Sequence, residues 1–153
     1  MKTVAISLLG TQLDDRGKGK KRWDRWRPTL SLCQHEDLVI DRLELLFQPQ
    51  YQALADELTR DIQIVSPETQ VKHNHIKLSN PWDFESVYAN LLDFARDYTF
   101  NNEKEDYLLH ITTGTHVAQI CLYLLTEAYY IPGKLIQSSP PQKDESISGH
   151  YQI

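Results

Sequence analysis

YLLHITTGTHVAQICLYLLTEA, residues 107–128, is the stretch that decides the fold. Its first six residues form a short apolar run of the kind found in buried strands. After the polar loop TTGTH, apolar residues recur at three- and four-residue spacing, as on one face of a helix. These residues are Val117, Ile120, Cys121, Leu124, Leu125 and Ala128. A strand, a tight polar loop and a helix are the parts of a βαβ unit, so this segment predicts an α/β fold.

The flanking sequence repeats the same order of elements. Further strands are predicted over residues 4–9, 38–47, 71–78 and 134–137, and further helices over residues 28–36, 51–65 and 80–98. The run 4–9 is apolar at nearly every position, which is typical of a strand buried on both faces. Strands that alternate with helices of about ten to fifteen residues form right-handed βαβ units. We therefore predict a Rossmann-like α/β domain, a three-layer sandwich around a mainly parallel sheet.

Length and composition are those of one soluble domain. The 153 residues are enough for a single core and too few for two. No run approaches the ~20 apolar residues that a membrane span requires, and the run 4–9 is too short for a signal peptide. Cys33 and Cys121 have apolar neighbours and no CxxC spacing. We expect two buried, reduced thiols in a cytoplasmic protein with no membrane association.

The C-terminal tail differs from the rest of the chain. Residues 142–149 are polar, after which Tyr151 and Ile153 are apolar. We interpret residues 1–141 as one domain. Residues 142–153 are then a polar tail and the start of a further element, truncated from a longer protein.

Positive charge is concentrated in one segment. Residues 16–27 hold seven basic residues and one acid, whereas the rest of the chain has a net charge of −11. Arginine binds phosphate in a bidentate manner, and tryptophan offers a face on which a base can stack. We therefore expect this segment to contact RNA or a nucleotide through Lys20, Lys21, Arg22, Trp23, Arg25 and Arg27. The alternative is a solvated charge run whose tryptophans anchor it to the core.

Two loops have the composition of an anion site. In an open α/β sheet, ligands bind beyond the carboxyl ends of the strands, and helix N-termini there favour anions. Loop 10–12 follows the first predicted strand and loop 112–116 follows the fourth. Their residues are the candidate ligand-binding residues: Gly10, Thr11, Gln12, Thr112, Thr113, Gly114, Thr115 and His116. The alternative is that loop 112–116 only caps a helix, with Thr113 or Thr115 as the capping residue.

Several familiar motifs are absent from the sequence. It has neither the GxxxxGK[ST] phosphate loop nor the GxGxxG dinucleotide fingerprint. His73 and His75 share a strand face but lack a third metal ligand at useful spacing, and His110 is expected in the core. No nucleophile motif and no close carboxylate pair occurs. We therefore expect no metal, no cofactor and no catalytic residue, and a binding protein in place of an enzyme.

Four segments resemble a known family. They are GKGKKRWDRWRPTLSLC (17–33), DRLELL (41–46), PWDF (81–84) and DYLLHITTGTHVAQIC (106–121). All four closely resemble the N-terminal domain of the RtcR family, sigma-54-dependent activators of bacterial RNA-repair operons. That domain belongs to the CARF class of CRISPR-associated Rossmann-fold sensors. The resemblance extends from the first strand to about residue 141.

The resemblance implies a regulatory function. CARF domains commonly form homodimers and bind nucleotide ligands, often cyclic oligoadenylates, through the loops after the first and fourth strands. In RtcR-like proteins the domain restrains an adjoining AAA+ ATPase until an RNA-damage signal binds. The expected signal is RNA, or a tRNA fragment, with a 2′,3′-cyclic phosphate end. The 153 residues contain neither the ATPase nor the helix-turn-helix DNA-binding domain of such activators, so they can supply only transcription regulation through ligand sensing.

Three other interpretations remain open at this point. A cyclic oligoadenylate sensor would use the same fold and loops. A ring-nuclease-like phosphodiesterase would use the hydroxyls of residues 112–115 to orient the 2′-hydroxyl of its ligand. A dimerisation module would use the basic segment to contact the ATPase.

Overall fold

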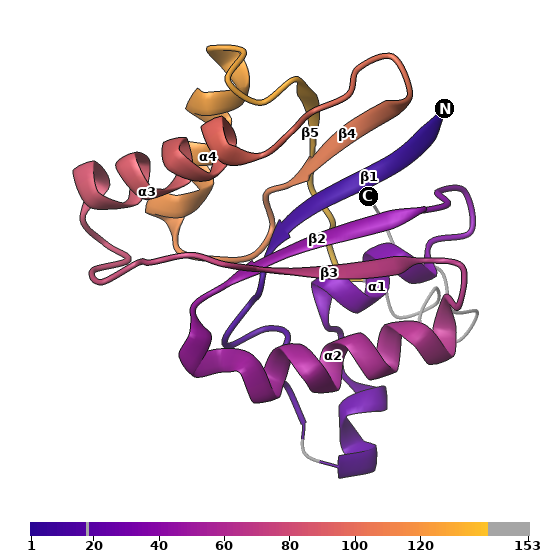
Figure 1. Ribbon diagram of the computed structural model, residues 1–153. Helices are drawn as coiled ribbons and strands as arrows, with labels where there is room; N and C mark the ends of the chain where they lie inside the picture. The colour runs from indigo at the N-terminus through magenta and orange to yellow at the C-terminus, as the bar shows by residue number, and fades with distance from the viewer. Residues whose placement is uncertain (18, 141–153) are drawn as a thin grey trace.

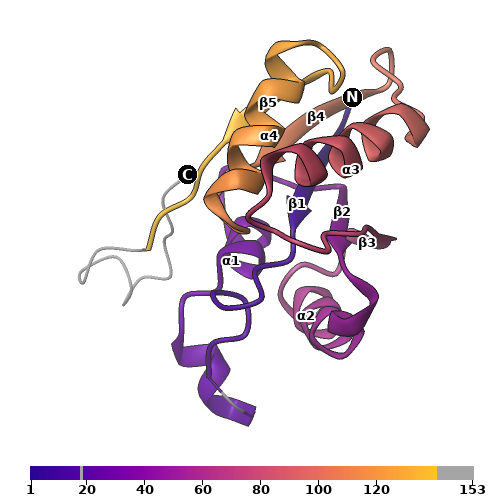
Figure 2. The ribbon, with the colours of Figure 1, turned by 90° about the vertical axis from the view of Figure 1, so that its left-hand side faces the viewer.

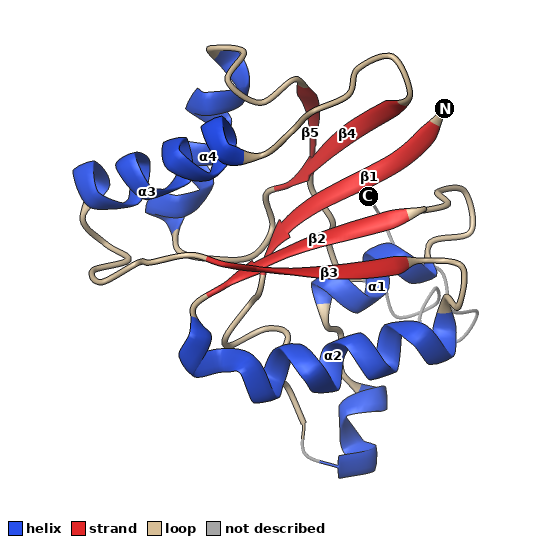
Figure 3. Cartoon of the chain, viewed as in Figure 1, coloured by secondary structure: helices blue, strands red, loops and turns tan. Residues whose placement is uncertain are grey.

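The computed structural model describes residues 1–17 and 19–140, so the predicted tail 142–153 lies outside the described residues. Five parallel strands form one sheet in the order β3-β2-β1-β4-β5 (Figures 1 and 3). Their bounds are β1 Lys2–Leu8, β2 Arg42–Phe47, β3 Gln70–His75, β4 Glu105–His110 and β5 Gly133–Ile136. The predicted α/β fold with a parallel sheet is confirmed.

Helices cover both faces of the sheet. One face carries α1 (Pro28–Gln34) and α2 (Gln52–Val65), and the other carries α3 (Phe84–Asp97) and α4 (His116–Glu127). Figure 2 shows the resulting three layers, with the sheet between the two helix pairs. Two 3₁₀ helices, η1 (Gly19–Asp24) and η2 (Pro49–Tyr51), complete the described elements. None of the described helices is long and apolar enough to cross a membrane.

The central strand β1 separates two cores. Val4, Ile6 and Leu8 belong to the core beneath α3 and α4, whereas Ala5 and Leu9 belong to the core beneath α1 and α2. Successive side chains of a strand point to opposite faces, so an apolar run without alternation requires burial on both sides. Cys33 and Cys121 lie one in each core, and both are buried free thiols, as predicted.

Some predicted boundaries were wrong by a few residues. The second strand begins at Arg42 and not at residue 38. Just before it, the side chain of Asp41 accepts a hydrogen bond from the amide of Thr3 at 2.8 Å. The third strand ends at His75 and not at residue 78. It is one of the two edge strands of the sheet, next to β2 alone, as its alternating pattern predicted.

The apolar stripe predicted for the last helix was partly wrong. The buried positions of α4 are Ala118, Cys121, Leu122, Leu125 and Thr126. Ile120 is 52% exposed and Leu124 is 38% exposed. Both faces of α4 are rich in apolar residues, so spacing alone could not tell the face that packs on the sheet from the face that remains outside.

Candidate functional site

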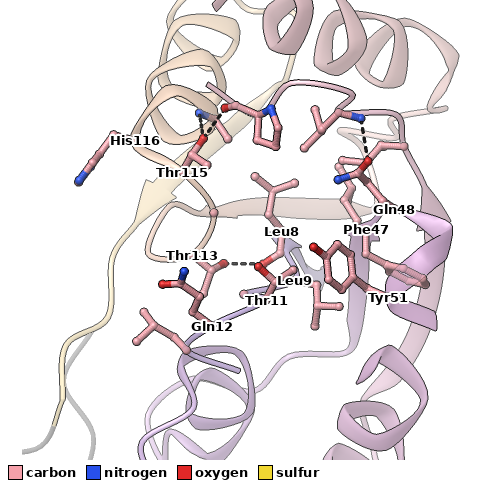
Figure 4. A pocket seen from close by; sticks show the side chains of 18 of the residues that line it. Leu8, Leu9, Thr11, Gln12, Phe47, Gln48, Tyr51, Thr113, Thr115 and His116 are labelled. Atoms are coloured by element: carbon pink, nitrogen blue, oxygen red, sulfur yellow. Dashed lines mark hydrogen bonds between the residues drawn. The ribbon is translucent and has the colours of Figure 1, made fainter. Parts of the chain in front are cut away.

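A pocket of about 330 Å³ lies where the carboxyl ends of β1, β2, β3 and β4 meet (Figure 4). The loop after each of these strands contributes to its lining. Seven predicted site residues line it: Gly10, Thr11, Gln12, Thr113, Gly114, Thr115 and His116. Two loops chosen from the sequence, about a hundred residues apart in the chain, therefore form adjacent parts of one pocket.

The loop after β1 is held by the buried carboxylate of Asp14. It accepts hydrogen bonds from the amide of Gly10 at 2.7 Å and from the hydroxyl of Thr29 at 2.7 Å. Burial raises the pKa of Asp14, and the bonds from Thr29 and Gly10 act against that rise. A Cβ atom at Gly10 would lie 2.9 Å from the Cγ2 atom of Thr113, so glycine is needed for the two loops to meet.

The threonine hydroxyls of the loop after β4 are used within the protein. Thr113 donates to the carbonyl of Leu8 at 2.5 Å. Thr115 donates to the carbonyl of Pro81 at 2.8 Å and caps α4 by accepting from the amide of Ala118 at 3.1 Å. The capping role of Thr115 is thus confirmed, and the hydroxyls of Thr113 and Thr115 both have a partner within the protein.

Thr112 is the one residue of loop 112–116 that does not line the pocket. Its hydroxyl accepts from the amide of Ser138 at 2.8 Å, beside the end of β5. Gly114 has a φ of +90°, a conformation that glycine adopts without strain. Each threonine of the loop therefore has a structural partner, and it is the backbone that is left for a ligand.

Backbone N–H groups without a partner lie on both loops of the pocket. Among the described residues, no hydrogen-bond acceptor is found for the amides of Thr11 and Gln12 in one loop or of Gly114, Thr115 and His116 in the other. The last two lie at the N-terminus of α4, where the helix dipole favours negative charge. His116 is exposed at the rim, and Figure 4 shows its ring directed away from the cavity.

The opposite wall of the pocket was not predicted from the sequence. It consists of residues from the ends of β2 and β3 and from the elements that follow them: Leu46, Phe47, Gln48, Tyr51, Ile76, Leu78 and Trp82. A topological rule could have predicted it. Neighbouring parallel strands end at the same edge of the sheet, so the loops after the second and third strands lie at the same edge as those after the first and fourth.

The structure separates the basic segment from the pocket. None of Lys20, Lys21, Arg22, Trp23, Arg25 or Arg27 lines the cavity. In both ribbon views η1 lies beyond α1 and α2, at the end of the molecule away from α3 and α4 (Figures 1 and 2). Any contact of these side chains with RNA or a nucleotide would therefore be made outside the pocket.

Two of the predicted phosphate-binding arginines are paired inside the protein. Arg27 is 1% exposed and donates to Asp61 at 2.7 Å. Arg22 donates to both oxygens of the same carboxylate, at 2.8 and 3.0 Å. The guanidinium groups of both arginines lie 5.2–5.4 Å from the centre of the Trp23 ring. Arg22 and Arg27 therefore position the segment, whereas Lys20, Lys21 and Arg25 are exposed and free to meet a ligand.

Three histidines outside the pocket, His73, His75 and His110, have structural surroundings. His110 is fully buried between the hydroxyls of Ser7 at 3.0 Å and Ser138 at 2.8 Å, and burial lowers its pKa to about 4. His73 and His75 pack edge-on against Phe47. Within residues 1–17 and 19–140, no group of three or more histidine, cysteine, aspartate or glutamate side chains is arranged to hold a metal ion.

Solved structures share this fold. Enterococcus italicus Csm6 bound to cyclic hexa-2′-fluoro-hexa-dAMP aligns with 97% of this chain and 38% of its own, at a TM-score of 0.66 and 20% identity. Can2 from Sulfobacillus thermosulfidooxidans, in complex with cyclic tetra-adenylate, aligns with 90% of this chain and 32% of its own, at a TM-score of 0.56 and 14% identity. These likenesses confirm the predicted CARF-type fold.

Sequence comparison identifies the family. The chain is 63% identical over 152 residues to the transcriptional regulatory protein RtcR of Escherichia coli (strain K12), covering 99% of this chain and 29% of that protein. It thus spans about three tenths of the length of its curated relative. The family model described as regulator of RNA terminal phosphate cyclase matches residues 1–153. The predicted resemblance is confirmed: the chain belongs to the RtcR family of regulators.

Proposed function

We propose that this chain is the ligand-sensing domain of a transcription regulator of RNA repair. Its ligand is an RNA, or a tRNA fragment, that ends in a 2′,3′-cyclic phosphate. The observation that carries the proposal is the pocket at the strand ends, where unpaired amides of Thr11, Gln12, Gly114 and Thr115 come together. Backbone amides at a helix N-terminus bind phosphate without a charged side chain, and the cyclic phosphate is the group by which such an RNA end differs from a hydroxyl end.

The exposed cations of η1 and the neighbouring Arg25 give the RNA a second contact. Lys20, Lys21 and Arg25 lie outside the pocket and are not paired within the described residues. An RNA longer than the pocket can hold would meet them with its backbone, which raises affinity without reading sequence. The pocket therefore recognises the end, and the basic segment holds the body of the RNA.

A second copy of the chain is the proposed partner of α4. Ile120, Tyr123 and Leu124 are exposed on the outer face of that helix, at 52, 47 and 38%. Apolar residues grouped in this way mark interaction surfaces, and a two-fold axis allows one patch to serve both protomers. His116 begins α4 at the pocket rim, so pairing along α4 would bring two pockets together.

Control of an adjoining AAA+ ATPase completes the proposal. A ligand can shift the arrangement of a dimer only if it binds one arrangement more tightly than the other. RNA bound between two pockets would favour the arrangement in which both sets of amides face it. In the full-length regulator this shift would release the ATPase and allow transcription.

The test is a titration of the chain with one short RNA in two forms, ending in a 2′,3′-cyclic phosphate or in a hydroxyl. Cyclic tetra- and hexa-adenylate are measured in parallel. Tighter binding of the cyclic-phosphate RNA is expected. Gly114→Ala, which places a side chain at a φ of +90° in the amide-bearing loop, should weaken that binding, whereas Gly19→Ala, also at a positive φ but outside the pocket, serves as the matched control. Equal affinity for the two RNA ends would refute the RNA-end proposal.

A cyclic oligoadenylate is the second candidate ligand. The observation in its favour is that Csm6 and Can2, which share the fold, are seen with cyclic oligoadenylate-type ligands. Saturable binding of cyclic tetra- or hexa-adenylate, with no response to the RNA end, would establish this alternative. Turnover of the bound ring would then show a ring-nuclease-like phosphodiesterase.

A further inference from the structure

Half of the pocket is lined by apolar and aromatic side chains, which a phosphate group does not need. The amides that suit an anion lie on the loops after β1 and β4. The opposite wall is apolar and aromatic, with Phe47, Ile76 and Leu78 beneath and the rings of Tyr51 and Trp82 at the opening. A phosphate group is bound by donors and gains nothing from such a wall. The wall instead fits the flat apolar face of a ligand that also carries phosphate.

Trp82 is exposed, and hydrogen bonds fix the backbone of the loop that carries it. Its side chain is 65% exposed although it lines the pocket. The carbonyl of the residue before it, Pro81, accepts a hydrogen bond from the hydroxyl of Thr115. The amide of Trp82 itself donates to the side chain of Asn80 at 3.1 Å. The capping threonine of α4 therefore also fixes the loop that carries Trp82. In the described part of the chain, neither Trp82 nor Tyr51 packs against another aromatic ring. Tyr51 is partly buried against the core beneath α1 and α2, so Trp82 is the more accessible of the two rings.

Two polar groups lie beside the rings. The Oε1 atom of Gln48 accepts from the amide of Leu78 at 3.4 Å, which orients the side-chain amide. Figure 4 shows the Nε2 atom of Gln48 directed toward the cavity and the ring of Tyr51 beside it. No partner is found among the described residues for that Nε2 atom or for the Tyr51 hydroxyl. Every nucleobase has acceptor atoms on its edge that such donors can meet.

We infer that this wall is a nucleobase subsite, in which one base stacks on Trp82 or Tyr51 and its edge accepts a hydrogen bond from Gln48. The inference rests on the proposed function, because the base must belong to a nucleotide whose phosphate meets the amides across the pocket. Both a terminal RNA nucleotide and a unit of cyclic oligoadenylate have this chemistry. The pocket volume of about 330 Å³ lies at the lower end of the range for small-ligand sites, which fits one nucleotide and not several.

The experiment compares two RNA trinucleotides that end in a 2′,3′-cyclic phosphate. One has a base on its last nucleotide, and the other is abasic at that position. Both are titrated against the wild-type chain and against Trp82→Ala, Tyr51→Phe and Tyr129→Ala. Tyr129 is an aromatic residue, 88% exposed, that does not line this pocket, so it is the matched control for loss of an exposed ring.

Wild type should bind the ligand with a base about five- to 150-fold more tightly than the abasic ligand, the range that stacking on one aromatic ring gives. In Trp82→Ala this difference should shrink severalfold, whereas Tyr129→Ala should retain it. Tyr51→Phe keeps the ring and tests the hydroxyl alone. Because the readout is a difference between two ligands on one protein, a general effect on folding does not produce it.

The outcomes also separate this inference from the proposed function. If wild type prefers the cyclic-phosphate end but binds the abasic ligand equally well, the subsite is refuted and the RNA-end proposal stands. If wild type binds only cyclic tetra-adenylate, the same variants are titrated with that ring, and an unchanged affinity in Trp82→Ala refutes the subsite there. If none of these ligands binds, both proposals fall.

Discussion

Replacing Asp61 with asparagine should destabilise the fold strongly, because Asp61 is the partner of a buried positive charge. The side chains of Asp61 and Arg27 are each 1% exposed, and they meet at 2.7 Å. Only the Nη1 atom of Arg27 makes this bond, and its buried Nε and Nη2 atoms have no hydrogen-bond partner among the described residues. Without the carboxylate, Arg27 would be a buried cation without its ion-pair partner, whereas Arg22, whose side chain is 21% exposed, can turn to water.

Breaking a buried ion pair by removing one partner costs about 3–5 kcal/mol. In a domain of this size, 1 kcal/mol shifts the midpoint of thermal unfolding by about 2–4 °C, so the expected decrease is about 6–20 °C. Circular dichroism during heating and urea unfolding at pH 7 would measure it. Asp56→Asn is the matched control, since Asp56 is on the same helix with its side chain 47% exposed.

Two further results would complete the test. The double variant Asp61→Leu with Arg27→Met should recover most of the lost stability, because it removes both charges. In wild type, burial raises the pKa of Asp61, but the hydrogen bonds from Arg22 and Arg27 outweigh it and the net pKa is lowered. The pair therefore stabilises the fold above the ordinary aspartate pKa, and this contribution is lost as the pH falls through the lowered value. A thermal midpoint for Asp61→Asn within about 2 °C of wild type would refute the reasoning.

Three more predictions concern the loops, the core and the basic segment. Burial lowers the pKa of His110 to about 4, so the folded state resists its protonation. The free energy of unfolding should therefore decrease as the pH falls from about 6.5 toward 4. His110→Gln should reduce this pH dependence, measured by urea unfolding. Thr115→Ala removes the cap of α4 and the bond to Pro81 and should cost about 1–2 kcal/mol, with faster amide hydrogen exchange at the start of α4; unchanged exchange there would contradict the capping role. Changing Lys20, Lys21 and Arg25 together to glutamine should reduce the slope of log affinity against log salt by about 2 for a long RNA and leave a dinucleotide unaffected; equal slopes would remove this segment from the RNA contact.

The order of elements and the class of fold could be predicted from the sequence. The apolar run in β1 and the helical spacing in α3 are local patterns, and a short loop between strand and helix leaves few alternatives to a parallel sheet. The predicted boundaries differed from the observed ones at Arg42 and His75, where pairing with a neighbouring strand decides the end of a strand.

Half of the site could also be predicted. Loops 10–12 and 112–116 follow neighbouring strands, and the rule that ligands bind at the carboxyl ends of parallel strands places them together. Tyr51 and Trp82 were not predicted, because an aromatic residue near the start of a helix has the same pattern whether it lines a pocket or packs in the core.

The sequence by itself determined the alternation of strands and helices, the parallel sheet and the two loops at one edge, because these depend on spacing within short segments. Only the tertiary structure decided which polar groups remain for a ligand. Arg27 meets Asp61 across 34 positions of sequence, and Thr113 meets the carbonyl of Leu8 across 105. Such partners come together only when the chain folds, and a hydroxyl or guanidinium that is paired there no longer binds phosphate.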